Sequence, residues 1–162
     1  MITYTTLENV SYETLYDSFM KAFVGFRIVE EADYQTFSDM LDAQHYDPKI
    51  SIGAFDSKTG ELVGFVLNSI VENDNETAYD ILTGTIPNYR RLGISRKIFA
   101  KIKELLKQKQ VKLYTTEVLK TNPTALNLYL SLGFEIQSEV TKIIKIPNGS
   151  REVNEYKIVL KI

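Results

Sequence analysis

Apolar residues recur along the chain with two periods, one typical of helices and one typical of strands. In residues 11–24, 31–44 and 93–110 they return every three or four positions, which predicts three amphipathic helices. Apolar runs bounded by turn signals predict strands at residues 1–7, 49–55, 61–70, 76–86, 111–119, 134–146 and 151–162. A fourth, short helix is expected at residues 122–133, because Asn122 suits its N-cap, Pro123 its first position and Gly133 its C-terminal cap.

The order of these elements predicts an α/β (α+β) domain on a mixed sheet. The turn at residues 56–60 and the dipeptide Asn148-Gly149 each separate two apolar runs, so each indicates a hairpin. One strand, two helices and three strands are followed by helix, strand, helix and two strands. No repeat, low-complexity tract or linker interrupts this order, and we expect a single domain over residues 1–162.

Composition narrows the possible chemistry. The chain has 162 residues, of which 44% are apolar and 25% charged, as in an ordinary globular domain. The absence of Cys excludes disulfides, thiolate metal sites and a cysteine nucleophile, and a single histidine, His45, excludes an HExxH zinc motif. We therefore expect no metal. Without a signal peptide or a run of about eighteen apolar residues, a soluble, cytoplasmic protein with no membrane partner is expected.

Charge is divided unevenly along the chain. Residues 1–80 carry four Lys and Arg against 15 Asp and Glu, a balance of −11, whereas residues 81–162 carry 15 against six, a balance of +9. This asymmetry predicts either two surfaces that meet partners of opposite sign or an attraction between the two halves themselves.

The stretch "IPNYRRLGIS" (residues 86–95) has the features of an anion site. It lies between a predicted strand and a predicted helix, where unpaired backbone amides and the helix dipole favour anions. Gly93 permits close approach of the backbone, and Arg90, Arg91 and Arg96 add charged donors. These properties suit a pyrophosphate, although neither a Walker loop nor a GxGxxG fingerprint is present. The alternative is a solvated basic helix start.

A second informative stretch, "TTEVLKTNPTALNLYLSLGF", covers residues 115–134. Glu117 lies on a predicted strand among apolar and hydroxyl neighbours, where an unpaired carboxylate is costly. Tyr129 lies in the helix that follows. Taken singly, Glu117 also fits an exposed strand and Tyr129 a core aromatic.

Together the two stretches resemble the GNAT superfamily of N-acetyltransferases. Arg90-Arg91-Leu92-Gly93-Ile94-Ser95 matches the family's [Q/R]-x-x-G-x-[G/A] loop, with Ser95 as the one departure. The later motif is matched by Glu117-Val118, Asn122, Ala125 and Leu128-Tyr129-Leu130-Ser131-Leu132-Gly133-Phe134. The resemblance implies a GNAT fold, with a mostly antiparallel sheet of six to seven strands, helices on both faces and a splayed central strand pair.

The resemblance also implies acetyl-CoA as co-substrate. The loop amides of residues 91–95 should hold its pyrophosphate, and the backbone of residues 83–85 should pair with its pantetheine arm like an added strand. The implied cofactor-binding residues are Thr83, Gly84, Thr85, Arg90, Arg91, Leu92, Gly93, Ile94, Ser95, Arg96, Asn122 and Tyr129.

Transfer to a primary amine by direct attack in a ternary complex needs a base and an acid. An amine with a pKa near about 10 is mostly protonated at neutral pH, and Glu117 is the candidate base, aided by burial. Asp80, acting through a water, is the alternative. Backbone amides near Thr85 should stabilise the oxyanion. Tyr129 is the proton donor to the departing thiolate that the family implies.

The acidic first half predicts a cationic acceptor, such as a polyamine, an aminoglycoside-like amine or a basic peptide N-terminus. In this fold the first helices line the acceptor side, and here they carry Glu30, Glu31, Asp33, Asp39 and Asp42. His45 either shapes the acceptor pocket or is a surface or capping residue.

Three other interpretations follow from the same residues. A non-catalytic acyl-CoA sensor or interaction module on this fold is the alternative to an enzyme. Nucleic-acid binding is disfavoured by a pI near 5.5 and by the lack of clustered aromatics on the basic face. The final hairpin offers an edge through which a homodimer could form.

Overall fold

The computed structural model describes residues 1–26, 32–146 and 148–162, which form one seven-stranded sheet. Its strands are β1 (Ile2–Thr6), β2 (Ile52–Asp56), β3 (Leu62–Ile70), β4 (Thr77–Thr85), β5 (Leu113–Leu119), β6 (Glu135–Ile146) and β7 (Gly149–Lys161). They lie in the order β1-β2-β3-β4-β5-β7-β6, and every neighbouring pair is antiparallel except β4 and β5. The predicted mixed, mostly antiparallel sheet is confirmed.

The helices of the described residues also lie where the sequence predicts them. They are α1 (Tyr12–Ala22), α3 (Tyr34–Ala43), α4 (Ile94–Gln108) and α5 (Pro123–Ser131). The side chains of Ser11, Asp33 and Asn122 cap α1, α3 and α5 by accepting a hydrogen bond from the amide three residues on. No described helix is long and apolar enough to cross a membrane.

The predicted start of the second strand is wrong. The strand expected from residue 49 begins only at Ile52, because Pro48–Ile50 forms a short 3₁₀ helix, η1. Asp47 starts this turn by accepting a hydrogen bond from the amide of Lys49, and the ring of Pro48 favours the helical φ at the first position. Residue 31, expected to open the second helix, lies outside the described residues.

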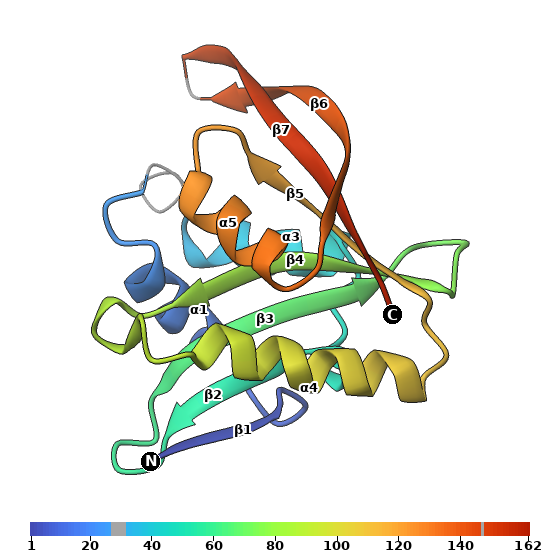
Figure 1. Ribbon diagram of the computed structural model, residues 1–162. Coiled ribbons are helices and arrows are strands. Elements are labelled where there is room, and N and C mark those ends of the chain that lie inside the picture. The colour runs from blue at the N-terminus through green and yellow to red at the C-terminus, as the bar shows by residue number, and fades with distance from the viewer. Residues whose placement is uncertain (27–31, 147) are drawn as a thin grey trace.

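Helices cover both faces of the sheet, as predicted (Figure 1). On one face α4 and α5 contribute Phe99 and Tyr129 to a core that includes Tyr114 of β5. On the other face α1 and α3 contribute Phe19 and Phe37 to a second core. Strand β3 is buried on both faces, which explains why its sequence is an almost unbroken apolar run.

The central strands β4 and β5 separate after a short paired stretch. Residues 77–79 of β4 pair with residues 113–115 of β5, and the rest of β5 pairs only with β7. At the same level β4 bulges, because Ile81 is an extra residue between those opposite Leu67 and Asn68. The predicted splayed pair is therefore present, and it leaves the β5 side of β4 open beyond Asp80.

Candidate active site

A cavity of about 620 Å³ lies where β4, the loop before α4 and the start of α5 meet. Eleven of the twelve predicted cofactor-binding residues line it, namely Thr83, Gly84, Thr85, Arg90, Arg91, Gly93, Ile94, Ser95, Arg96, Asn122 and Tyr129. The remaining residue, Leu92, is 61% exposed and is not part of the lining. Two separate motifs of the sequence thus meet around one cavity.

Several lining residues were missed by the sequence analysis. Phe23 and Phe26 come from the end of α1 and the chain after it, and Tyr89 comes from the short helix η2 (Pro87–Tyr89). Phe23 falls within the amphipathic helix predicted for residues 11–24, and no ligand-binding role was expected of it. Nothing in its spacing indicates that the end of α1 reaches the anion loop, since this contact depends on how the helix packs on the sheet.

The loop before α4 has the backbone that an anion site requires. Arg91 and Gly93 both have positive φ angles, of 64° and 76°. An ideal Cβ on Gly93 would meet no atom within 4 Å, so its conformation and not crowding favours glycine here. Gly93 is also the N-cap of α4 and makes no side-chain cap bond, which leaves the first amides of the helix available at the cavity wall.

Arg90 ties this loop to its surroundings. Its Nη2 donates to the carbonyl oxygen of Ala22 at 2.7 Å, and its Nε donates to the carbonyl oxygen of Thr85 at 3.1 Å. Ala22 is the last residue of α1, so the guanidinium satisfies a carbonyl at the helix end. Arg90 therefore lines the cavity while two of its donors hold α1 and β4 together. Arg96 donates to Ser131 Oγ at 2.8 Å.

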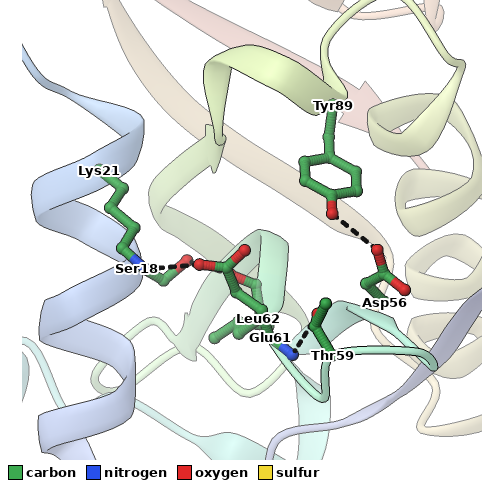
Figure 2. A network of polar contacts seen from close by, with 7 residues as sticks. All are labelled: Ser18, Lys21, Asp56, Thr59, Glu61, Leu62 and Tyr89. Atoms are coloured by element: carbon green, nitrogen blue, oxygen red, sulfur yellow. Dashed lines mark hydrogen bonds and ion pairs between the residues drawn. The ribbon is translucent and has the colours of Figure 1, made fainter.

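The β2–β3 hairpin holds the same loop from the other side (Figure 2). Tyr89 OH donates to Asp56 Oδ2 at 2.6 Å, and Ser18 Oγ of α1 donates to the carbonyl oxygen of Leu62 at 2.8 Å. An ion pair between Lys21 and Glu61 lies beside them and is partly exposed, so it contributes little. Together these contacts fix α1, the hairpin and the anion loop relative to one another.

Tyr129 lies between the cavity and the point where β4 and β5 separate. Its hydroxyl donates to Asp80 Oδ2 at 2.7 Å and lies 3.2 Å from Thr83 Oγ1. Thr83 also donates to Asp80 Oδ2, whereas Asp80 Oδ1 is buried and has no hydrogen-bond partner among the described residues. Burial raises the pKa of Asp80 to about 6, and burial together with this carboxylate holds the pKa of Tyr129 well above its usual value. None of the ion pairs among the described residues involves Asp80.

Glu117 lies in a different environment, on the face of the sheet that carries α1 and α3. Its carboxylate accepts a hydrogen bond from Tyr79 OH and forms an ion pair with Lys142 Nζ at 3.1 Å. Lys142 also lies 3.0 Å from Glu155 Oε1. Burial opposes the charge of Lys142, but the hydrogen bonds to Glu155 and Glu117 outweigh it and raise the pKa of Lys142. Glu117 is thus a paired carboxylate, and neither it nor Asp80 lines the cavity.

The acidic residues expected on the acceptor side are partly used within the helices. Asp33 caps α3, Asp39 accepts from Gln35, and Asp42 accepts from Tyr12. Glu30 and Glu31 lie outside the described residues. His45 follows α3 with a φ of 57° and is exposed, as expected for a residue that ends a helix.

Comparison with known proteins agrees with this geometry. The Acetyltransferase (GNAT) family model matches residues 12–134. The chain therefore belongs to the GNAT family of acetyltransferases, and it is an acyltransferase of the GNAT type.

Solved structures share the fold over the whole chain. The ribosomal-protein-S18-alanine N-acetyltransferase from Escherichia coli has 21% identity and a TM-score of 0.76, with 100% of this chain and 94% of that one covered. A NatC complex bound to Gag peptide and CoA has 20% identity and a TM-score of 0.70, with 99% of this chain and 98% of that one covered. A putative acetyltransferase from Salmonella typhimurium, in a structure with its cofactor acetyl-CoA, has 12% identity and a TM-score of 0.72, with 99% of this chain and 93% of that one covered.

Proposed function

We propose that the protein is an acetyl-CoA-dependent N-acetyltransferase that moves an acetyl group to a primary amine by direct attack in a ternary complex. The observation that carries this proposal is the cavity itself. A basic loop with free helix amides forms one end, and the hydroxyl of Tyr129 lies beside the splay of β4 and β5. A charged diphosphate and a reactive acyl group need these two environments.

The lining residues fit CoA. The amides of residues 91–95, with Arg91 and Arg96, would hold the pyrophosphate. The open side of β4 at residues 83–85 would pair with the pantetheine arm, since no strand of the described part of the chain occupies that side. Asn122 lines the cavity while it caps α5. Because Arg90 already donates to two carbonyls, we assign it to the shape of the loop and only secondarily to phosphate.

When bound, acetyl-CoA supplies the thioester carbonyl that the amine attacks. Tyr129 would protonate the departing sulfur, and backbone amides near Thr85 would stabilise charge on the carbonyl oxygen. Glu117 would remove the proton of the amine. Asp80 is 1% exposed, so we assign it the positioning of the Tyr129 hydroxyl in place of direct proton removal.

The acceptor is proposed to be cationic. The balance of −11 over residues 1–80 supports this class. One structural neighbour is a ribosomal-protein-S18-alanine N-acetyltransferase, and another is a NatC complex bound to Gag peptide and CoA. A peptide N-terminus or an alkylamine therefore comes first among candidates. A cytoplasmic location remains a prediction.

The test is release of free thiol from acetyl-CoA in the presence of polyamines, aminoglycosides, amino acids and short peptides. Turnover with at least one amine, together with an acetylated product by mass spectrometry, is expected. Saturable binding of acetyl-CoA without thiol release across the panel would favour the alternative, a non-catalytic acyl-CoA sensor.

We also propose that the β6–β7 hairpin provides a surface for a homodimer. β6 is the last strand of the sheet and extends beyond the helices in Figure 1, and it exposes Ile143 (75%) and Ile144 (40%). An open apolar edge is a template for pairing with a second chain. Sedimentation of the wild-type protein and of Ile143→Lys should give a dimer and a monomer; two monomers would contradict the proposal.

A further inference from the structure

On the α1/α3 face of the sheet, side chains from four strands form one polar cluster that contains an ammonium group. Lys142 Nζ of β6 lies 3.1 Å from Glu117 Oε1 of β5 and 3.0 Å from Glu155 Oε1 of β7. Tyr79 of β4 donates to Oε2, the other oxygen of Glu117. The result is a cation site that holds an alkylammonium, supplied here by the protein's own lysine.

The two carboxylates and the lysine differ in how firmly they are held. The side chains of Glu117 and Glu155 are 20% and 16% exposed, whereas that of Lys142 is 44% exposed. Carboxylates this buried need a counter-charge, because an unpaired one is poorly solvated. Lys142 instead reaches the site on a flexible stem from the edge strand. The carboxylates are therefore the fixed part of the site and the ammonium is the exchangeable part.

The site borders the opening in the sheet. Tyr79 is the last residue of β4 that pairs with β5, and Glu117 lies two residues beyond its partner Thr115. The next residue of β4, Asp80, accepts from Tyr129 at the cavity on the other face. An amine attacking an acyl group at the splay would therefore approach the sheet beside this cation site.

Both oxygens of Glu117 already have a donor, so an amine that uses this carboxylate as its base must compete with one of them. The Tyr79 hydroxyl is carried by a rigid aromatic side chain within the sheet. If the incoming amine displaced it from Glu117, a half-buried phenol would be left without a hydrogen-bond partner. Lys142 is half-exposed and can move into water. The lysine is thus the donor that gives way.

We propose that the acceptor's ammonium displaces Lys142 Nζ and lies between Glu117 and Glu155, so that Lys142 is a tethered competitor that determines which acceptors bind. This inference rests on the proposed transfer to an amine. Of the two classes placed first above, it favours alkylamines, that is, primary amines on an unbranched aliphatic stem, over a peptide N-terminus, because such a group is what the site holds. A neutral acceptor would leave the two carboxylates without a counter-charge.

The test measures binding of 1,4-diaminobutane to the free protein by calorimetry. Lys142→Met keeps the length of the stem and removes the charge, and its affinity for diaminobutane should be about fivefold higher than that of the wild type. Lys142→Arg should resemble the wild type. Lys145→Met, on the same strand but three positions away, is the matched control and should also leave the affinity unchanged.

Two further measurements separate displacement from a structural effect. Adding Glu155→Gln to Lys142→Met should abolish the gain, and the uncharged analogue 1,4-butanediol should not distinguish Lys142→Met from the wild type. Equal affinity of the wild type and Lys142→Met for diaminobutane, or no binding to either, overturns the inference.

The outcome is independent of turnover. If diaminobutane binds with this pattern but no amine of the panel releases thiol, the proposed function fails and the cation site stands. If amines are acetylated while the Lys142 variants bind diaminobutane equally, the function stands and this inference fails.

Discussion

Two tyrosine–carboxylate pairs flank the splay of β4 and β5, one on each face of the sheet, and their carboxylates differ in burial and in counter-charge. On the cavity face Tyr129 donates to Asp80, which is fully buried and has no cation beside it among the described residues. On the opposite face Tyr79 donates to Glu117, which forms an ion pair with Lys142. Only the pair on the opposite face thus has a counter-charge among the described residues.

Without a cation, burial favours the protonated form of a carboxyl group, and Asp80 accordingly has a pKa of about 6. Glu117 has the ammonium of Lys142 beside it as a counter-charge, and in the proposed mechanism it receives the proton of the amine. In the proposed mechanism the sheet thus separates the proton donor, Tyr129, from the proton acceptor, Glu117. Each of the following predictions tests one member of the two pairs.

The largest effect is expected for Tyr129→Phe. The ring should keep its edge-to-face contacts with Phe99 and Phe134, so the fold and the affinity for acetyl-CoA should be preserved. Loss of the hydroxyl removes the proposed acid, and kcat should fall by about 1,000-fold. Thiol release at saturating acetyl-CoA measures this. An unchanged kcat would remove Tyr129 from the mechanism.

Glu117→Gln should lower kcat by about 100-fold, since water can partly replace a base that is already ion-paired. The loss should shrink as pH rises and more of the amine is free. A pH profile of kcat/KM for the variant and the wild type measures this. A variant as active as the wild type at pH 7 would show that another group takes the proton.

Asp80→Asn should keep the fold and change how the free energy of unfolding depends on pH. The native pKa of about 6 lies above the unfolded value of 3.8, so the native state binds the proton more tightly between these values. The free energy of unfolding of the wild type should therefore fall as pH rises from about 4 to about 6. This fall should be absent in the variant, so the variant gains about 1–3 kcal/mol over the wild type across the window.

Urea unfolding of both proteins at several pH values between 4 and 7 gives this difference directly. Glu117→Gln serves as the control for removing one carboxylate elsewhere. Parallel pH dependences for the wild type and Asp80→Asn would mean that Asp80 is not held protonated by burial.

The sequence predicted most of the cavity and little of this contrast. Arg91, Gly93 and Asn122 could be placed because their local roles, a loop conformation and a helix cap, depend on neighbours in the chain. Asp80 and Glu117 could be named as candidates, but the sequence does not show which of the two carboxylates is fully buried and which is ion-paired. The partner of Glu117 is Lys142, 25 residues away on an edge strand, and no spacing indicates that pair.

The same reason explains Arg90. Its charge suggested a phosphate ligand, yet its guanidinium bonds to the carbonyl of Ala22, 68 residues earlier in the chain. A basic residue beside an anion loop has the same appearance in sequence whether it binds the ligand or supports the loop. Only the packing of α1 against the sheet distinguishes the two roles.

The smallest effect is expected for Tyr79→Phe, the counterpart of Tyr129→Phe on the other face. Its hydroxyl donates to Glu117 but does not line the cavity, so its loss should lower kcat/KM by only about threefold and stability by about 1 kcal/mol. The KM for acetyl-CoA should not change. Steady-state kinetics beside Tyr129→Phe under the same conditions provides the comparison. If the two variants lost equal activity, the assignment of the proton donor to Tyr129 on the cavity face would be wrong. The proposed separation of donor and acceptor by the sheet would then be wrong as well.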